Sequence, residues 1–289
     1  LTLDGTTYTS TGAQTYEAAT GQNIDITNTS GTTFTSTNTA IAFNTSGVDL
    51  ANDGTTTINT GTGAGTVTFQ GAIETDGGND DILTVTSGTG NVTFTGALGA
   101  TNKLSSIAIN SSSGSGAITL SGNIGDGDSD GVNSTATFGN TSTSTLTLAG
   151  TIYKTNHVTT YRTTSGNNIL ITGGDVLISS GHNLRFHTGN VVLSTDGTTT
   201  INTSNREIRF DGTIEGTASQ AENLVLESSS GSVKLFGAIG GTNPITDLTI
   251  NSSGTGAISI TQIGDADDVG GIVGTTAIGN TSTTGITFD

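Results

Sequence analysis

The chain alternates apolar and polar residues in short runs of the form apolar–x–apolar, often with Thr in the middle. Four such runs lie at 67–69, 92–94, 118–120 and 146–148. A period of two places the apolar side chains on one face of a strand and Thr on the other. Clusters of Gly, Ser, Asn and Asp separate the runs, and such clusters form turns. The pattern predicts an all-β protein built from many short strands.

The spacing of these runs predicts how the strands stack. The four runs begin 25 to 28 residues apart, and a Gly-x-apolar triplet follows each of them. A regular period of this length is typical of solenoids, in which each repeat packs only on its neighbours. We therefore predict a parallel β-helix with rungs of about 25 residues, stacked at the strand spacing of roughly 4.8 Å. Like residues then form ladders along the axis.

A longer repeat is superimposed on the rungs. The octapeptide DGTTTINT occurs at 53–60 and again at 196–203, and GNTST occurs at 139–143 and 279–283. We divide the chain into copy 1 (1–145) and copy 2 (146–289). The last four residues match the beginning of each copy, so we expect the sequence to be a window on a longer tandem array.

Tandem β-sandwich domains, one for each copy, are the alternative architecture. A sandwich usually has a large aromatic residue at the centre of its core. This chain has no Trp and only 4 Tyr among 289 residues. The scarcity of aromatic residues favours the β-helix.

The charge of the chain narrows the list of partners. There are 24 Asp and Glu against 7 Lys and Arg, which gives a formal net charge of -17. Such a charge repels phosphate backbones and anionic membrane surfaces, so we expect no nucleic-acid partner. No apolar run approaches the roughly 18–20 residues of a membrane span. The chain has no Cys, which excludes thiolate metal sites and disulfides.

Segment 91–126, NVTFTGALGATNKLSSIAINSSSGSGAITLSGNIGD, resembles large repetitive bacterial surface proteins of the filamentous haemagglutinin-like and β-strand-repeat adhesin type. The resemblance rests on the rhythm of strand, GAxG and strand, and it extends over essentially the whole chain. It implies an extracellular or cell-surface protein that forms an extended stalk, attaches cells or builds a matrix. It also implies host or cell-surface glycans or proteins as partners.

An acidic turn in each copy is the sharpest local motif. Alternate carboxylates followed by Gly131 resemble the first half of a calcium loop, which supplies oxygen ligands at positions 1, 3 and 5 and a Gly at position 6. No Glu follows at position 12, so a solvated acidic turn without metal is the alternative. The candidate Ca²⁺ ligands are Asp126, Asp128 and Asp130 in copy 1 and Asp265, Asp267 and Asp268 in copy 2.

Catalytic residues are not indicated. All three His and six of the seven basic residues fall in copy 2, and we interpret them as surface substitutions. Recurring acidic pairs such as Glu74 and Glu215 have no recurring basic or His partner beside them. We therefore predict no catalytic or cofactor-binding residues and no enzyme activity. A polysaccharide-acting β-helix enzyme is the alternative from that class.

Thr-rich strands suggest a second alternative. Flat Thr ladders on a β-helix can order water at lattice spacing, and segments 55–57, 141–143 and 145–147 supply such Thr. Thr is also simply a favourable outward residue in a sheet of low charge. Thr ladders at rung spacing would favour an ice-binding protein, and scattered Thr would not.

The sequence thus favours an extracellular structural or adhesive repeat protein, a stalk, fibre or matrix element. Its mechanism is mechanical, because each rung donates backbone hydrogen bonds to the next. Uncapped rungs expose strand edges that can pair with another chain. We therefore expect self-association with copies of the same chain, and self-assembly into filaments is a variant of this hypothesis.

Overall fold

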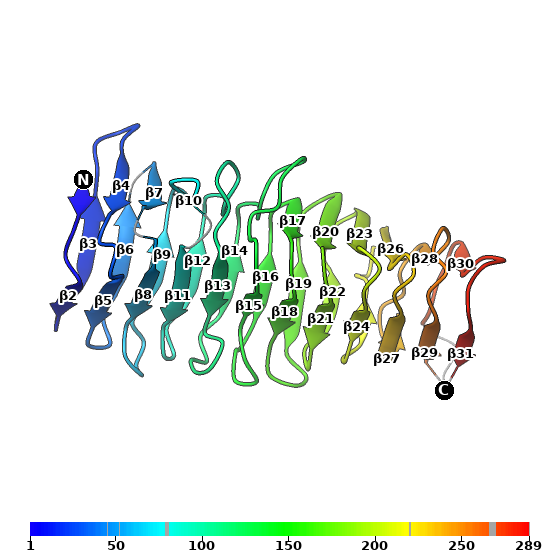
Figure 1. Cartoon of the computed structure of the whole chain (residues 1–289). Coiled ribbons are helices and arrows are strands. Elements are labelled where there is room, and N and C mark those ends of the chain that lie inside the picture. Colours follow the sequence, from blue (N-terminus) through cyan, green and yellow to red (C-terminus); the bar gives the residue numbers. More distant parts are fainter. Residues whose placement is uncertain (45, 52, 79–80, 220, 266–269, 289) are drawn as a thin grey trace.

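Parallel strands wind into a single β-solenoid of about 11 turns in the computed structural model (Figure 1). The structure describes residues 1–44, 46–51, 53–78, 81–219, 221–265 and 270–288. Within these ranges the regular structure is β, and none of it is helical. The prediction of a parallel β-helix with rungs of about 25 residues is confirmed.

Three rows of parallel strands run the length of the rod, and all strand pairs in them are parallel. Row 1 contains β2 (Thr7–Ser10), β5 (Thr32–Ser36), β8 (Thr55–Asn59), β11 (Ile82–Thr86), β13 (Ser106–Ile109), β15 (Ala136–Phe138), β18 (Thr159–Arg162), β21 (Leu184–His187), β24 (Ile208–Phe210), the first halves of β27 (Val233–Ile239) and β29 (Ile258–Ile263), and β31 (Ile286–Phe288).

Row 2 follows row 1 around each turn. It contains β3 (Gln14–Glu17), β6 (Ile41–Asn44), β9 (Val67–Phe69), β12 (Val92–Phe94), β14 (Ile118–Leu120), β16 (Leu146–Leu148), β19 (Asn168–Ile171), β22 (Asn190–Leu193), β25 (Ile214–Glu215) and the second halves of β27 and β29.

Row 3 completes each turn. Two of its positions are single bridge residues, Leu98 and Ile124. Its strands are β1 (Thr2–Leu3), β4 (Asn23–Ile26), β7 (Gly47–Leu50), β10 (Ala72–Thr75), β17 (Ile152–Thr155), β20 (Val176–Ser180), β23 (Gly197–Thr203), β26 (Glu222–Glu227), β28 (Leu248–Ile250) and β30 (Thr276–Ile278).

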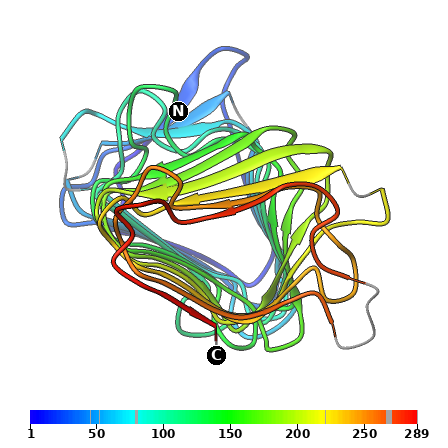
Figure 2. The ribbon, with the colours of Figure 1, turned by 90° about the vertical axis from the view of Figure 1, so that its right-hand side faces the viewer.

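The three rows enclose one continuous core. Viewed along the axis, they form the sides of a roughly triangular section (Figure 2). Inward residues stack on their counterparts in the next rung, as in the ladder Val67, Val92, Ile118 and Leu146. Every one of these four side chains is fully buried. The apolar spacing seen in the sequence is therefore the stacking register of the core.

In one rung the inward residue is not the last residue of the Gly-x-apolar triplet. Ile73, Leu98 and Ile124 end their triplets and pair along row 3, whereas Tyr153, one residue after the triplet 150–152, pairs with Ile124 and is fully buried. The Tyr153 hydroxyl accepts a hydrogen bond from the Gly150 amide (2.7 Å) and donates one to the Leu120 carbonyl (3.0 Å). Because both partners satisfy the buried hydroxyl, the aromatic ring can replace the smaller Ile in the core.

Corresponding strands of the two copies lie in different rows. The octapeptide of copy 1 contains β8, which lies in row 1 between β5 and β11, whereas the identical segment of copy 2 lies in β23 of row 3. From β1 to β16, its counterpart by sequence, the chain advances seventeen strand positions, two of them the bridges at Leu98 and Ile124. Three positions make one turn, so a copy spans five and two-thirds turns. Each feature of copy 1 therefore recurs one-third of a turn away.

Aromatic side chains in the core follow the same rotation. In row 2, Tyr16, Phe43, Phe69 and Phe94 stack with ring centroids 4.8 to 5.2 Å apart. Their sequence counterparts Tyr161, Phe186 and Phe210 stack in row 1 at 5.3 and 4.5 Å. Although aromatic residues are few, they are concentrated in these two ladders. A one-third turn thus moves this packing unit from one wall of the rod to the next, with Leu235 in the place of Phe94.

Candidate functional site

The acidic turn of copy 1 is folded by its own first carboxylate. Asp126 Oδ1 accepts backbone hydrogen bonds from Asp128 (2.9 Å) and Ser129 (2.5 Å). The amides of Ser129 and Asp128 hold the pKa of the Asp126 carboxyl below its usual value. Lys154 Nζ donates to the Gly127 carbonyl at 3.1 Å. Asp126 thus has a structural role in the turn, in addition to any ligand role.

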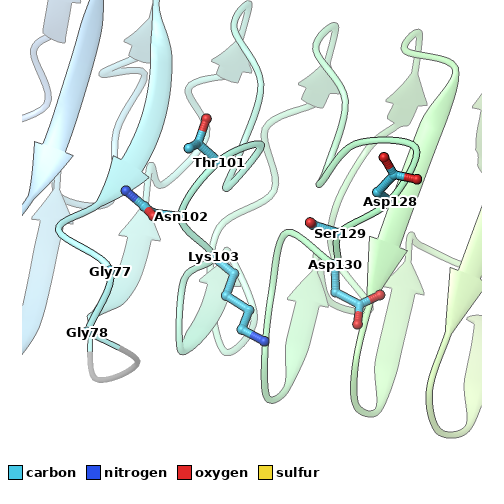
Figure 3. Close-up of a pocket in the computed structure, with 8 residues that line it drawn as sticks. All are labelled: Gly77, Gly78, Thr101, Asn102, Lys103, Asp128, Ser129 and Asp130. Atoms are coloured by element: carbon cyan, nitrogen blue, oxygen red, sulfur yellow. The ribbon is translucent and has the colours of Figure 1, made fainter.

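Asp128 and Asp130 lie on a cleft of about 440 Å³ beside this turn. The opposite wall is formed by Gly77, Gly78, and 101–103 from the preceding rungs (Figure 3). The two carboxylates point in different directions (Figure 3). Among the described residues, no three His, Asp or Glu side chains converge on a point where they could hold a metal ion. The Ca²⁺ site in copy 1 stays a prediction.

The acidic turn of copy 2 is described only at its beginning. Asp265 follows β29, while Asp267 and Asp268 lie outside the described residues. The prediction that these three residues bind Ca²⁺ likewise stays a prediction.

The recurring acidic pair Glu74 and Glu215 holds loops of the next rung. Glu74 accepts hydrogen bonds from the backbone amides of residues 100, 101 and 102, at 2.8 to 3.1 Å. Glu215 accepts them from the amides of Thr242 (2.9 Å) and Asn243 (3.0 Å). A carboxylate that accepts several amides is strongly bound to its loop. This shared role accounts for the recurrence of the pair without invoking catalysis.

A recurring buried Asn joins neighbouring rungs. Asn110 and Asn251 are fully buried and have a left-handed backbone with φ of 47°. Asn110 Oδ1 accepts from the Ser87 amide at 2.9 Å, and Asn251 Oδ1 accepts from the Ser228 amide at 2.7 Å. Each Asn also donates through Nδ2 to the Ser hydroxyl. The copies thus share an Asn–Ser link from one rung to the next.

The GNTST motif completes this link from the following rung. Asn140 Nδ2 donates to the Gly114 carbonyl at 2.8 Å, and Asn280 Nδ2 donates to the Gly254 carbonyl at 2.7 Å. The backbone amide of Asn140 donates a hydrogen bond to the Thr143 hydroxyl, and that of Asn280 donates one to the Thr283 hydroxyl. The repeated pentapeptide and the Asn–Ser link therefore together join three successive rungs.

A basic surface on copy 2 was missed by sequence reasoning. Arg185, Arg209 and Lys234 lie side by side on row 1, in register on successive strands, with side chains about one-third exposed. We call these three residues the basic column. Their spacing of 24 and 25 residues equals the rung period, and this signal could have predicted the column.

Asp211 is the centre of the cluster around the basic column. It accepts hydrogen bonds from Arg185 Nη2 (2.7 Å), Arg209 Nε (2.5 Å) and His187 Nδ1. Burial alone would raise the pKa of Asp211, but the hydrogen bonds from His187 and the two Arg outweigh it and lower the pKa to about 2. Burial, with the nearby positive Arg162 and Arg185, outweighs the Asp211 contact and lowers the pKa of His187.

Two further contacts define the end of the basic column. Lys234 Nζ lies 2.6 Å from Glu207 Oε2. The Arg209 guanidinium lies over the ring of Phe236 at 4.5 Å, and Phe236 is 44% exposed. Together with Arg162, four cations face two carboxylates, so this part of an acidic chain is locally positive.

Thr side chains form a second extended surface, on row 1 of copy 1. One outward column consists of Thr7, Thr33, Thr57 and Thr84 in register. The column beside it consists of Thr9, Thr35, Asn59 and Thr86, also in register. We call these eight residues the Thr array. These Thr are therefore arranged in ladders at rung spacing, which is the arrangement that the ice-binding alternative requires.

The Thr array is not repeated in copy 2. The counterparts of its first column lie on row 3 as Ile152, Leu177, Thr200 and Val225. These residues are only partly buried, and they give row 3 an apolar stripe. The surface chemistry thus differs between the copies, although the turns that stack the rungs are shared.

Comparisons with known proteins give no relative. No family model, no curated protein and no solved structure matches the chain. No helix long and apolar enough to cross a membrane occurs in the described part of the chain.

Proposed function

We propose that the chain is an extracellular structural or adhesive repeat protein, which serves as part of a surface stalk, fibre or matrix element. The observation that carries the proposal is the continuity of the three parallel rows, which pass from copy 1 into copy 2 through the pairs β14–β16 and β15–β18 and the bridge between Ile124 and Tyr153. A solenoid of this kind transmits load along its axis, because neighbouring rungs are joined by backbone hydrogen bonds.

The recurring polar residues support the same proposal. Glu74 and Glu215, Asn110 and Asn251, and Asn140 and Asn280 all join one rung to another. What the two copies keep in common is therefore the means of stacking. A repeated active site would instead keep an acid, a base and their neighbours on a shared surface.

Small-angle X-ray scattering and electron microscopy of the purified protein test this proposal. About 11 turns at the strand spacing of ~4.8 Å give a rod roughly 50 Å long. Rods of that length, or longer fibres of the same cross-section, support the structural function. Compact particles that hydrolyse or cleave a polysaccharide would overturn it in favour of the enzyme alternative.

A second function, ice binding, is favoured by the Thr array. Its two columns are separated by two residues along each strand, or about 6.6 Å, and successive rungs are about 4.8 Å apart. A regular grid of Thr methyl and hydroxyl groups of this kind can order water at lattice spacing. Thermal hysteresis of the purified protein in freezing solutions tests this function directly.

A further inference from the structure

A column of acidic residues on copy 1 matches the basic column of copy 2. Asp25, Asp49 and Glu74 lie in register on β4, β7 and β10 of row 3. Each of the three alternates with buried neighbours, so its side chain faces outward. We call these residues the acidic column. Both columns span three successive rungs.

The two columns have the same period because both are set by parallel strand pairing. Neighbouring strands in each row are about 4.8 Å apart. A carboxylate of one rod can therefore meet a cation of another rod at each rung, without a change of register.

The charged groups of each column differ in how far they are already bound within their own chain. Glu74 accepts hydrogen bonds from three amides of the next rung, whereas Asp49 accepts one, from Asn23 Nδ2 at 3.0 Å, so Asp25 and Asp49 are the main acidic groups. On the basic side, Arg185 and Arg209 share the single carboxylate of Asp211, which leaves an excess positive charge there.

We infer that the basic column of one chain binds the acidic column of a second copy of this chain, side by side along the rod. This inference rests on the proposed structural function, and it names the partner and the two surfaces. The basic column is on row 1 and the acidic column is on row 3, which face different directions (Figure 2). One neighbour cannot occupy both surfaces of a rod, so the contact is heterologous and open-ended.

The columns are also displaced along the axis. The acidic column occupies the second to fourth rungs, and the basic column begins on β21, six rungs after β4. Parallel rods would then be staggered by roughly 29 Å, which is six strand spacings of ~4.8 Å. Repetition of this contact produces a staggered lateral assembly.

Ionic strength distinguishes this contact from general charge effects. Repulsion between chains of net charge -17 acts over the Debye length, which is about 30 Å at 0.01 M salt but about 8 Å at 0.15 M. The column contact acts at short distance and is screened only near 1 M. We therefore expect association in sedimentation velocity to be strongest at intermediate ionic strength.

Two variants remove one column each. R185Q/R209Q disables the basic column, and D25N/D49N disables the acidic column. Each variant alone is expected to sediment as a monomer under conditions in which the wild type forms an open series of oligomers. An equimolar mixture is expected to form one-to-one dimers and nothing larger, because each chain in it retains only one working column.

Matched controls separate the columns from net charge. K103Q/R206Q makes the same change in charge as R185Q/R209Q, and D128N/D130N makes the same change as D25N/D49N. Both controls are expected to associate like the wild type. Wild-type oligomers that persist in both column variants, or a mixture that stays monomeric, would overturn the inference.

X-ray scattering on the same samples keeps this inference apart from the proposed function. Monomeric rods at every ionic strength would overturn the lateral contact alone. Particles without a rod-shaped cross-section would overturn the proposed function as well.

Discussion

Ile58 and Ile201 occupy the same place in two identical octapeptides, yet they lie on different walls of the rod. Ile58 pairs with Val85 in row 1, and Ile201 pairs with Leu226 in row 3. Both side chains are fully buried. The local sequence fixes which residue points inward, while the number of strand positions between the copies determines which wall it joins.

This relationship follows from a copy length of five and two-thirds turns. A further copy joined in the same way would be rotated by another third of a turn, and three copies would return a feature to its first row. The turns that join the rungs would then recur on all three sides of the rod. The surface residues, which differ between the copies, are free to give each side its own chemistry.

The buried Asn–Ser links are expected to stabilise the stack. Asn110→Ala removes the acceptor of the buried Ser87 amide and should lower the free energy of unfolding by about 1–3 kcal/mol. Asn110→Gly should lower the free energy of unfolding by about 1 kcal/mol less than Asn110→Ala does, because Gly adopts the left-handed backbone without strain. Urea unfolding measures both effects.

Asn251 offers an independent repeat of this experiment in copy 2. Asn251→Ala should cost as much as Asn110→Ala, since its Ser228 link has the same geometry. The control is Asn133→Ala, which removes only an exposed contact with Asn156 and should change stability by less than about 0.5 kcal/mol. Equal effects of all three Ala variants would contradict the role of the buried link.

Stability should depend on pH through Asp211. Its pKa is about 2 in the folded protein, below the ordinary value of 3.8. Because the folded pKa is the lower one, the carboxylate stabilises the fold above about pH 4, and this stabilisation is lost progressively as the pH falls from about 4 through the folded pKa of about 2. Asp211→Asn should therefore destabilise the protein at pH 7 by on the order of 1 kcal/mol, after allowance for solvent screening.

The same variant should cost less at pH 2, where the wild-type carboxylate of pKa about 2 is only about half ionised. Chemical unfolding of both proteins at pH 7 and at pH 2 measures the change. Asp175→Asn, outside the cluster, is the charge-matched control. A destabilisation by Asp211→Asn that is the same at both pH values would show that packing, and not charge, accounts for the effect.

The sequence predicted the rungs because the core requires apolar residues at a fixed spacing. Val67, Val92 and Ile118 are stacked as their spacing indicates. The inward position of Tyr153, one residue after its Gly-x-apolar triplet, could not be predicted, because hydrogen bonding of its hydroxyl inside the core depends on the fold. The one-third turn between copies could not be predicted either, since Leu98 and Ile124 count as strand positions but belong to no alternating run.

The candidate surfaces were predicted less well than the fold. The acidic turn at 126–130 was found because its three Asp alternate within five residues of the sequence, and the structure shows that Asp126 also folds the turn itself. Comparison of copy 2 with copy 1 does not indicate the basic column, because its residues have no basic counterparts in copy 1. The residues of the column become neighbours only when the chain is aligned by rungs, not by copies.

Calcium should stabilise the chain if the acidic turn binds it. We expect Ca²⁺ at millimolar concentration, the range of extracellular calcium modules, to raise the melting temperature of the wild type. D128N/D130N should abolish the increase, because it removes two of the candidate ligands and keeps the turn contacts of Asp126. D25N/D49N has the same net charge and should retain the increase. A response to Ca²⁺ of the same size in both variants would argue for nonspecific charge screening, as would an equal response to Mg²⁺.

Ice binding by the Thr array can be tested with a pair of matched substitutions in the repeated octapeptide. Thr57→Lys places a long charged side chain in the middle of the array, between Thr33 and Thr84. It should reduce thermal hysteresis severalfold, because a flat surface is needed for contact with the ice lattice. Thr200→Lys makes the same change in the same local sequence, but it lies on row 3 between Leu177 and Val225. Thr200→Lys should leave hysteresis unchanged, and both variants should keep the wild-type circular dichroism spectrum. Equal loss of hysteresis in the two variants, or a folded wild type that shows none, would exclude the Thr array as an ice-binding surface.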